Sequence, residues 1–215
     1  MYLVSLDISV NVALPDLTTS FDTDIQTVQW IIIFYVGSTT GLQLSLGSAV
    51  DRYGLRRLYI IGIITYTFAV FIIGISPTMP MVFGFRVVQA IGNGLILASG
   101  PALVSSIFQP DERGKGLGLM SSIMILGMVT GALFGGVLVD SFGWRAIFLC
   151  RVPLGIAALL LAVVVLKGLK NNTNSGPFDV KGSLTLFVGL VSLILFLSLG
   201  ETLGWESPTV LVLTL

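Results

Sequence analysis

Long apolar runs separated by short polar segments dominate this chain. A bilayer core about 30 Å thick needs about 20 apolar residues per helix, and only helices or closed barrels can cross it. Six runs have roughly that length: 27–50, 58–75, 81–108, 116–139, 146–166 and 182–199. Because strands that cross a bilayer are only about half as long, these runs predict membrane-spanning helices.

Two shorter apolar stretches lie at the ends of the chain. The first, Tyr2 to Leu14, rises only about 20 Å as an α-helix, which is less than the thickness of the bilayer core. The second begins at Pro208 and reaches Leu215. We expect both to be parts of longer membrane helices, and the chain to be a fragment of a longer protein.

The composition agrees with a membrane protein. Charged residues make up 10% of the chain and apolar residues 54%, with a mean hydropathy of +0.99, whereas soluble domains carry about 25% charged residues. The formal net charge is zero, so we expect no basic face for nucleic acid. The chain has no His and a single cysteine, Cys150, which excludes an internal disulfide and the usual Cys/His metal sites.

Known kinds of catalytic signature are also missing from the sequence. It contains no Gly-rich phosphate-binding loop that would indicate ATP use. It offers no nucleophile paired with a base and no metal-ligating cluster. We therefore expect no enzyme activity, no cofactor and no bound metal.

The basic residues are unevenly distributed over the loops, which predicts the orientation. Alternate loops carry eight Lys or Arg residues against one on the other side, and basic loops face the cytoplasm. The eight are Arg52, Arg56, Arg57, Arg113, Lys115, Lys167, Lys170 and Lys181. The exception is Arg145. The pattern predicts a multi-pass protein of the cell membrane with a cytoplasmic N-terminus.

One turn sequence occurs twice along the chain. Gly47–Arg56 aligns without gaps on Gly136–Arg145, with the shared pattern G-x-x-V-D-x-aromatic-G-x-R. Three predicted spans separate the copies, so the two turns lie on opposite membrane faces. This arrangement is typical of an inverted repeat of three helices plus three, which is found mainly in secondary transporters.

Several motifs together carry a resemblance to a known family. The turn Gly47–Arg57 reads GSAVDRYGLRR. The other motifs, in chain order, are LDISVNVALP (6–15), RVVQAIGNG (86–94), GMVTGALFGG (127–136) and GWRAIFLCRVPLG (143–155). In this order they resemble the major facilitator superfamily, and within it the 14-span drug:proton antiporters of the QacA/EmrB type.

The resemblance implies an all-α polytopic membrane fold. Residues 1–166 are expected to form the N-terminal six-helix transporter bundle, a 3+3 inverted repeat with a truncated first helix. Residues 167–181 are then a cytoplasmic linker. Residues 182–215 are a seventh span and a truncated eighth.

The cytoplasmic turn is expected to act in gating. Gly47 suits close helix approach and Gly54 suits a turn with positive φ. In the family, the residue equivalent to Asp51 latches the N-terminal half to a helix of the C-terminal half. A solvated anchor on anionic headgroups is the alternative for Arg52, Arg56 and Arg57.

Ionisable and amide side chains within predicted spans are the candidates for proton coupling or a substrate cavity. A carboxylate in hydrocarbon marks a cavity or a proton site, and Asp7 has Asn11 one turn later as a potential hydrogen-bond donor. The resemblance implicates Arg86 in proton coupling, with Gln89 at i+3. A wet helix end for Asp7 and snorkelling of Arg86 to the interface are the alternatives.

A glycine repeat and an unusual arginine complete the candidates. Gly127, Gly131 and Gly135 recur every four residues, with Gly136 beside them, and let two backbones approach closely. The family's segment, taken to favour export, has a proline where this chain has Ala132. Arg151 replaces the family's usual Asn, and either snorkels or binds an anionic group.

Three functions are compatible with the sequence. The first is proton-coupled efflux of small amphipathic or drug-like molecules by alternating access. The second is another major-facilitator carrier, for instance for uptake. The third is an inactive or regulatory half-transporter. Expected partners are the small-molecule substrate, protons, membrane lipid, and a C-terminal bundle or a second half-transporter.

Overall fold

A computed structural model describes residues 1–169, 180–203 and 205 of the chain. The described residues form helices and no strand. In chain order the elements are α1 Tyr2–Ser5, η1 Leu6–Ala13, α2 Leu14–Phe21, α3 Ile25–Tyr53, α4 Leu55–Gly74, α5 Met79–Ile107, η2 Pro110–Glu112, α6 Arg113–Phe142, α7 Trp144–Leu149, α8 Arg151–Val165, η3 Leu166–Gly168 and α9 Val180–Leu203. The three η elements are 3-10 helices.

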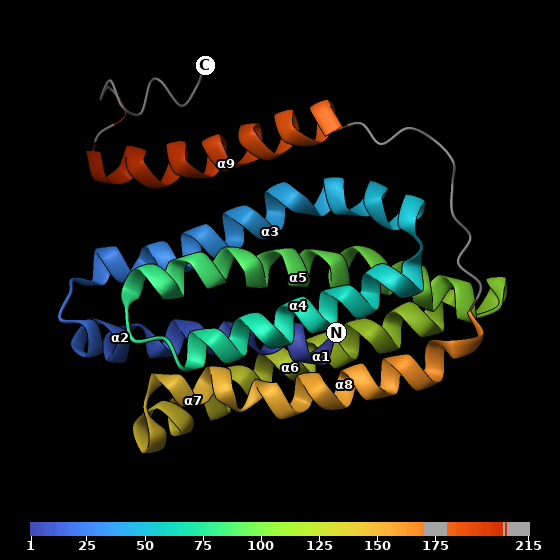
Figure 1. Ribbon diagram of the computed structural model, residues 1–215, viewed down its shortest axis with the longest axis horizontal. Coiled ribbons are helices and arrows are strands. Elements are labelled where there is room, and N and C mark those ends of the chain that lie inside the picture. Colours follow the sequence, from blue (N-terminus) through green and yellow to red (C-terminus); the bar gives the residue numbers. More distant parts are fainter. Residues whose placement is uncertain (170–179, 204, 206–215) are drawn as a thin grey trace.

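The long helices run side by side and turn at the two ends of an elongated bundle, while α9 lies along α3 (Figure 1). In the described part of the chain, four segments are long and apolar enough to cross a membrane: Leu55–Gly74, Met79–Ile107, Pro110–Phe142 and Trp144–Gly168. A fifth is α3 if its two arms, inclined by 51°, count as one span. These correspond to the five runs predicted between 27 and 166.

The run predicted as the seventh span forms the helix α9, whose apolar part, Leu184–Gly200, is shorter than the candidate spans above. It contacts α3 where Gly41 faces the ring of Phe187. Most of the predicted linker, 170–179, and the run that begins at Pro208 lie outside the described residues.

The N-terminal segment is not the regular α-helix that the sequence led us to expect. Between the short helices α1 and α2, Leu6–Ala13 forms a 3-10 helix of 8 residues, although 3-10 runs longer than about four residues are uncommon. Tertiary contacts from α6 and α8 to this segment, described below, hold this conformation. The segment lies inside the bundle, against the other helices.

Glycines allow α6 to lie against the N-terminal segment. Gly127, Gly131 and Gly135 are buried. An added Cβ at Gly131 would lie 3.1 Å from the carbonyl oxygen of Leu6, and one at Gly135 would lie 2.7 Å from Cβ of Ser9. The predicted close approach therefore exists, and its partner is η1. Gly136 faces a looser space, with Val12 at 3.7 Å.

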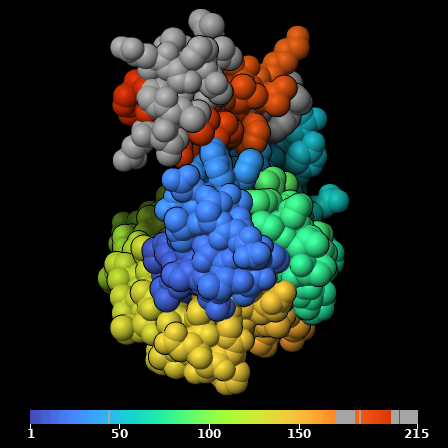
Figure 2. All heavy atoms as spheres, turned by 90° about the vertical axis from the view of Figure 1, so that its left-hand side faces the viewer, coloured from blue at the N-terminus to red at the C-terminus, as the bar shows by residue number. Residues whose placement is uncertain are grey.

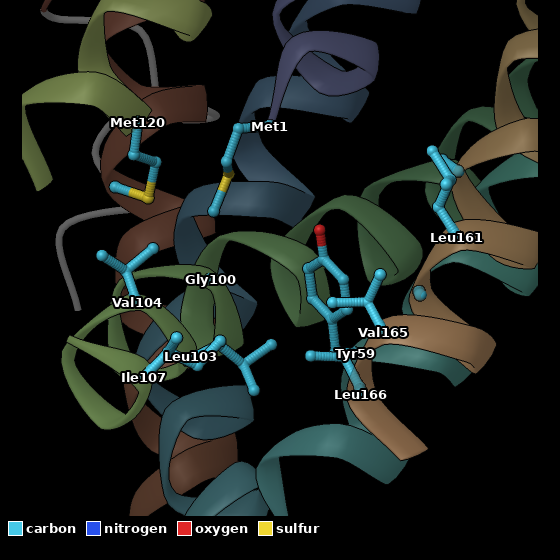
Figure 3. Close-up of a pocket in the computed structure, with 12 residues that line it drawn as sticks. Met1, Tyr59, Gly100, Leu103, Val104, Ile107, Met120, Leu161, Val165 and Leu166 are labelled. Atoms are coloured by element: carbon cyan, nitrogen blue, oxygen red, sulfur yellow. The ribbon is translucent and has the colours of Figure 1, made fainter. Parts of the chain in front are cut away.

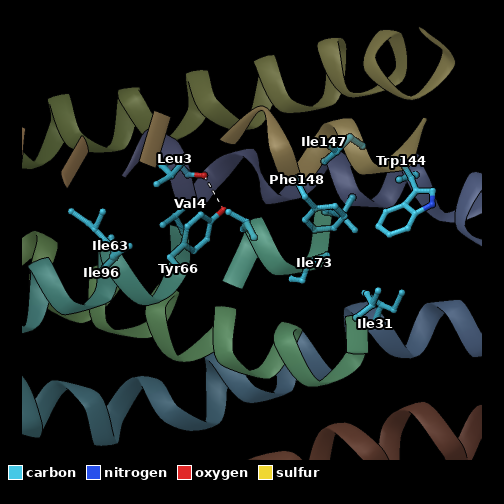
Figure 4. Packing of buried hydrophobic residues seen from close by; sticks show 14 of the residues in the cluster. Leu3, Val4, Ile31, Ile63, Tyr66, Ile73, Ile96, Trp144, Ile147 and Phe148 are labelled. Carbon is cyan, nitrogen blue, oxygen red and sulfur yellow. Dashed lines mark hydrogen bonds between the residues drawn. The ribbon is translucent and has the colours of Figure 1, made fainter. Parts of the chain in front are cut away.

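The closest crossing of α4 and α5 also depends on glycine. A Cβ on Gly92 would lie 2.5 Å from the backbone nitrogen of Tyr66 and 2.9 Å from the carbonyl oxygen of Gly62. Tyr66 is thereby brought into the core beside the aliphatic and aromatic residues drawn in Figure 4. Since lipid is as apolar as these side chains, such van der Waals contact between helices contributes to their association.

Both copies of the repeated turn have a glycine with positive φ. At Gly54, φ is +95° between α3 and α4, and at Gly143, φ is +76° between α6 and α7. Each glycine N–H donates to the carbonyl four residues earlier, at 3.0 Å to Val50 and 2.8 Å to Val139. The two turns lie at opposite ends of the bundle (Figure 1), as an inverted repeat requires.

Gly47 differs from its predicted role. In the part of the chain that the structure describes, no atom lies within 4 Å of an ideal Cβ at Gly47. The expectation of a close helix approach at this residue is therefore wrong for the described residues, because no backbone of another helix lies beside this position.

The end of the bundle that holds the α6–α7 turn and the start of α3 is rich in carboxylates (Figure 2 views this end). The backbone N–H of Trp144, at the start of α7, donates to Oδ2 of Asp16 at 2.7 Å. Asp24 caps the start of α3, and the hydrogen bond from the hydroxyl of Thr27 lowers the pKa of its carboxyl below the usual value. Carboxylates thus stabilise the N-terminal ends of two helices.

Candidate functional site

Asp7 is the centre of a buried polar cluster that joins five elements. Its Oδ1 accepts hydrogen bonds from Gln89 Nε2 at 2.9 Å, from the hydroxyl of Tyr66 at 3.1 Å, and from Arg151 Nη1, with which it forms an ion pair. Its Oδ2 accepts from the hydroxyl of Tyr35. Since the donors come from α3, α4, α5 and α8, this carboxylate links η1 to four helices.

Arg151 also binds η1. Its Nη2 donates to the carbonyl oxygen of Leu6 and to Oγ of Ser9, both at 2.7 Å, while Nη1 donates to Asp7. The side chain is 1% exposed, so snorkelling to the interface is wrong for this residue. Its anionic partner among the described residues is Asp7 of the same chain.

Arg86 is equally buried, at 1% exposure, which also rules out snorkelling here. Its Nη1 donates to Oε1 of Gln89 at 3.0 Å. Its guanidinium carbon lies 4.8 Å from the ring centre of Phe148 and 5.2 Å from that of Tyr35, at distances suited to cation–π interaction. Gln89, completely buried, therefore bridges Arg86 and Asp7.

Three residues of this cluster, Tyr35, Tyr66 and Asn93, are not among the candidates that the sequence predicts. Asn93 Nδ2 donates to the hydroxyl of Tyr35 at 2.5 Å, and Tyr66 also donates to the carbonyl oxygen of Leu3 at 3.2 Å (Figure 4). A signal for Asn93 exists, because it follows Gln89 by four positions and shares its helix face. The two tyrosines lie in apolar runs without such a signal.

Asn11 does not take part in the cluster. It is exposed, and its expected alignment with Asp7 is wrong, because a 3-10 helix has three residues per turn and residue i+4 is rotated away by about 120°. Ser9, which lies within one turn, instead faces Arg151.

The candidate gating turn lies at the end of the bundle, apart from the cluster. Asp51, Arg52 and Arg57 are exposed, and Arg56 is half-buried. The guanidinium of Arg52 lies 5.6 Å from the ring centre of Tyr53.

A separate apolar cavity of about 370 Å³ opens among α4, α5, α6 and α8 (Figure 3). Its lining residues are Met1, Tyr59, Gly100, Leu103, Val104, Ile107, Met120, Ala158, Leu161, Ala162, Val165 and Leu166. Tyr59 is the one side chain with a polar group in this set, so the cavity suits an apolar group. None of the residues that bind Asp7 lines it.

Nothing in the described part of the chain forms a metal centre. No three His, Cys, Asp or Glu side chains come together within residues 1–169, 180–203 and 205. The chemistry available in the buried cluster is that of one carboxylate, two guanidinium groups and neutral hydrogen-bonding side chains.

Apolar helices, an inverted repeat and buried ionisable side chains together define an all-helical polytopic membrane protein. The family model of the Major Facilitator Superfamily matches residues 3–215. The chain belongs to this superfamily.

Several relatives with curated names are similar to most of the chain. The riboflavin transporter RibZ of Clostridioides difficile (strain 630) is 30% identical over 196 residues, which are 91% of this chain and 43% of that protein. The multidrug resistance protein Stp of Mycobacterium tuberculosis (strain CDC 1551 / Oshkosh) is 31% identical over 215 residues, 99% of this chain and 40% of Stp. The multidrug export protein EmrB of Escherichia coli (strain K12) is 29% identical over 95% of this chain and 40% of EmrB.

The fold is also that of a solved transporter. The crystal structure of the peptide transporter POT in complex with sulfate matches with a TM-score of 0.70 and 16% identity, over 98% of this chain and 47% of that chain. At this identity the likeness concerns the fold alone. The chain thus spans less than half the length of these relatives and of this structure.

Proposed function

We propose that this chain is the N-terminal half of a proton-coupled exporter of small amphipathic, drug-like molecules in the cell membrane, with its N-terminus in the cytoplasm. The multidrug relatives and the uneven distribution of basic residues support the direction and the orientation. One observation supports the proposal: a largely buried carboxylate, Asp7, connects η1 to four helices through hydrogen bonds and an ion pair.

The proton step follows from these contacts. An ionised Asp7 accepts from donors on α3, α4, α5 and α8. Protonation removes the negative charge that attracts Arg151. The protonated carboxyl is itself a hydrogen-bond donor and is surrounded by other donors, so several of these contacts weaken together. Since they fix the N-terminal segment relative to the helices, protonation shifts the balance between two arrangements of the bundle.

Transport requires a second bundle. In carriers with inverted repeats, one bundle rocks against another around a site between them. We propose that the partner is a C-terminal bundle of the same longer protein, or a second half-transporter, and that Asp51 at the exposed turn latches onto it. Expressed alone, the chain is expected to give no dye efflux above background.

An uptake carrier is the second candidate function. The relative that favours it is the riboflavin transporter, which is as similar to this chain as the multidrug proteins are. An uptake carrier would use the same buried cluster and move its substrate in the opposite direction. An inactive or regulatory half-transporter is the third candidate, and predicts no transport in any complete assembly.

The test is a fusion of residues 1–203 to the C-terminal bundle of EmrB, expressed in cells loaded with ethidium. Efflux that stops on addition of a protonophore is the expected result. Asp7→Asn is expected to abolish it, whereas Asp24→Asn, at the exposed start of α3, is expected to retain it. Efflux that persists in Asp7→Asn cells at the wild-type rate would refute the proposed role of Asp7.

A further inference from the structure

The buried cluster carries more positive than negative charge. Arg86 and Arg151 are each 1% exposed, and arginine stays protonated in proteins. The ionisable groups that interact with Arg86 are Asp7, Arg151, Tyr35 and Tyr66, of which Asp7 alone is an acid of ordinary strength. Two guanidinium charges therefore face one carboxylate.

Arg86 is the cation that lacks an acidic partner. Among the described residues, the ion pairs are Arg151 with Asp7 and Lys115 with Glu112. Arg86 instead donates to the amide of Gln89, and its buried Nε has no hydrogen-bond partner. Asn93 Oδ1, further along the same helix, is buried and also without a partner. A buried charge without an acidic partner is costly.

We propose that the cluster binds one small carboxylate-type anion beside Arg86, as the counter-ion that the described residues do not supply. This rests on the proposed transport function in one respect: the anion is either the carboxylate group of the transported molecule or a free anion of the same chemistry.

The geometry around Arg86 favours a planar anion. A guanidinium presents parallel N–H groups that match a carboxylate, and Nε is the group left free here. The rings of Tyr35 and Phe148 flank this guanidinium and supply apolar contact for a flat acid. The side chain of Asp7 is 10% exposed and that of Arg86 is 1% exposed, so the cluster reaches its surroundings beside Asp7 and not beside Arg86.

The cluster has a net positive charge because it contains Arg151 as well as Arg86. Substitutions that change this net charge therefore test the proposal. Arg151→Asn makes the cluster neutral, and Asp7→Asn raises its charge by one. In both substitutions the new asparagine side chain is no larger than the native side chain. Adding or removing one full charge within the buried cluster changes its affinity for an anion by roughly tenfold to a hundredfold. Anion affinity is therefore expected to fall in Arg151→Asn and to rise in Asp7→Asn.

The experiment uses the purified chain in nanodiscs, in a buffer whose anions are large sulfonates. Benzoate, acetate and the neutral benzamide are titrated, and binding is measured by the rise in unfolding temperature and by the fluorescence of Trp144, whose ring packs on Phe148. A Trp30→Phe/Trp205→Phe background isolates this signal. Binding of benzoate alone identifies an acid with an aromatic body, and equal binding of acetate identifies a free anion.

Two results would overturn the proposal: binding of benzamide as tight as that of benzoate, or equal benzoate affinity in wild type, Arg151→Asn and Asp7→Asn. Arg57→Asn, an exposed arginine, is the control and is expected to bind as wild type does. The proposed function is tested separately, because Asp7→Asn is expected to abolish proton-coupled efflux while it strengthens anion binding.

Discussion

At the scale of single residues, the sequence was informative about which side chains are unusual and silent about their partners. Asp7 and Arg86 stand out as charges in apolar runs. The ion pair of Asp7 with Arg151 joins residues that are 144 positions apart, so no spacing argument could have found it. For Arg151, burial excludes snorkelling, and the ion pair identifies Asp7 as its anionic partner.

Replacing Arg151 tests the ion pair. Arg151→Asn introduces the residue usual in the family that the motifs resemble, and removes the donors to Asp7, Leu6 and Ser9. Asp7 keeps three other donors, so we expect a loss of about 1.5–3 kcal/mol of stability, measured by SDS-induced unfolding. Arg57→Asn is the matched control at an exposed position, expected within about 0.5 kcal/mol of wild type. Equal stability of the two variants would contradict the ion pair.

Backbone geometry makes a second prediction at this scale. Gly54 has φ of +95°, which side chains rarely adopt, so Gly54→Ala is expected to cost about 1–3 kcal/mol. Gly47→Ala, in the helical part of the same motif and with nothing within 4 Å of its Cβ, is expected to be neutral or to stabilise by up to about 1 kcal/mol. The comparison uses the same unfolding measurement, and a reversed order would argue against the turn geometry.

At the scale of elements, apolar length predicted the helices from 25 to 166 well, because hydrocarbon thickness sets it. It failed for the N-terminal segment. There, tertiary contacts decide the winding: the α6 glycines pack against η1, and Arg151 donates hydrogen bonds to Leu6 and Ser9. A 3-10 turn and an α turn of the same residues cannot be separated by an apolar pattern alone.

Adjacent glycines on α6 test the contact with η1. Gly135→Ala places a methyl group 2.7 Å from Cβ of Ser9, whereas Gly136→Ala places one 3.7 Å from Val12. Overpacking of this kind costs about 1–3 kcal/mol, so Gly135→Ala is expected to lower the unfolding temperature. Gly136→Ala is expected to leave it unchanged. Hydrogen exchange of the η1 amides should increase in the first variant only, and protection equal to wild type in both would speak against the packing.

At the scale of the whole molecule, the internal repeat connects sequence to topology. The two turns, each with a glycine of positive φ, lie at opposite ends of the bundle. An inverted repeat gives a protein two similar ends, which is how carriers open to one side and then the other.

Cysteine labelling tests this arrangement in the membrane. In a Cys150→Ser background, Asp51→Cys and Asp140→Cys both present exposed positions. A membrane-impermeant maleimide added to intact cells is expected to label position 140, and position 51 only after the membrane is opened. Labelling of both from the same side would remove the inverted topology, and with it the alternating-access proposal.

The sequence by itself determined the class of protein, the extent of the long helices between 25 and 166, the turn glycines and the repeat. These depend on bilayer thickness, local backbone freedom and chain order, which are properties of segments. Tertiary structure alone decided the winding of η1, the exclusion of Asn11, the burial of both arginines and the recruitment of Tyr35, Tyr66 and Asn93 around Asp7. Those outcomes depend on which helix faces meet, and charges buried far apart in the sequence find their partners only when the helices pack.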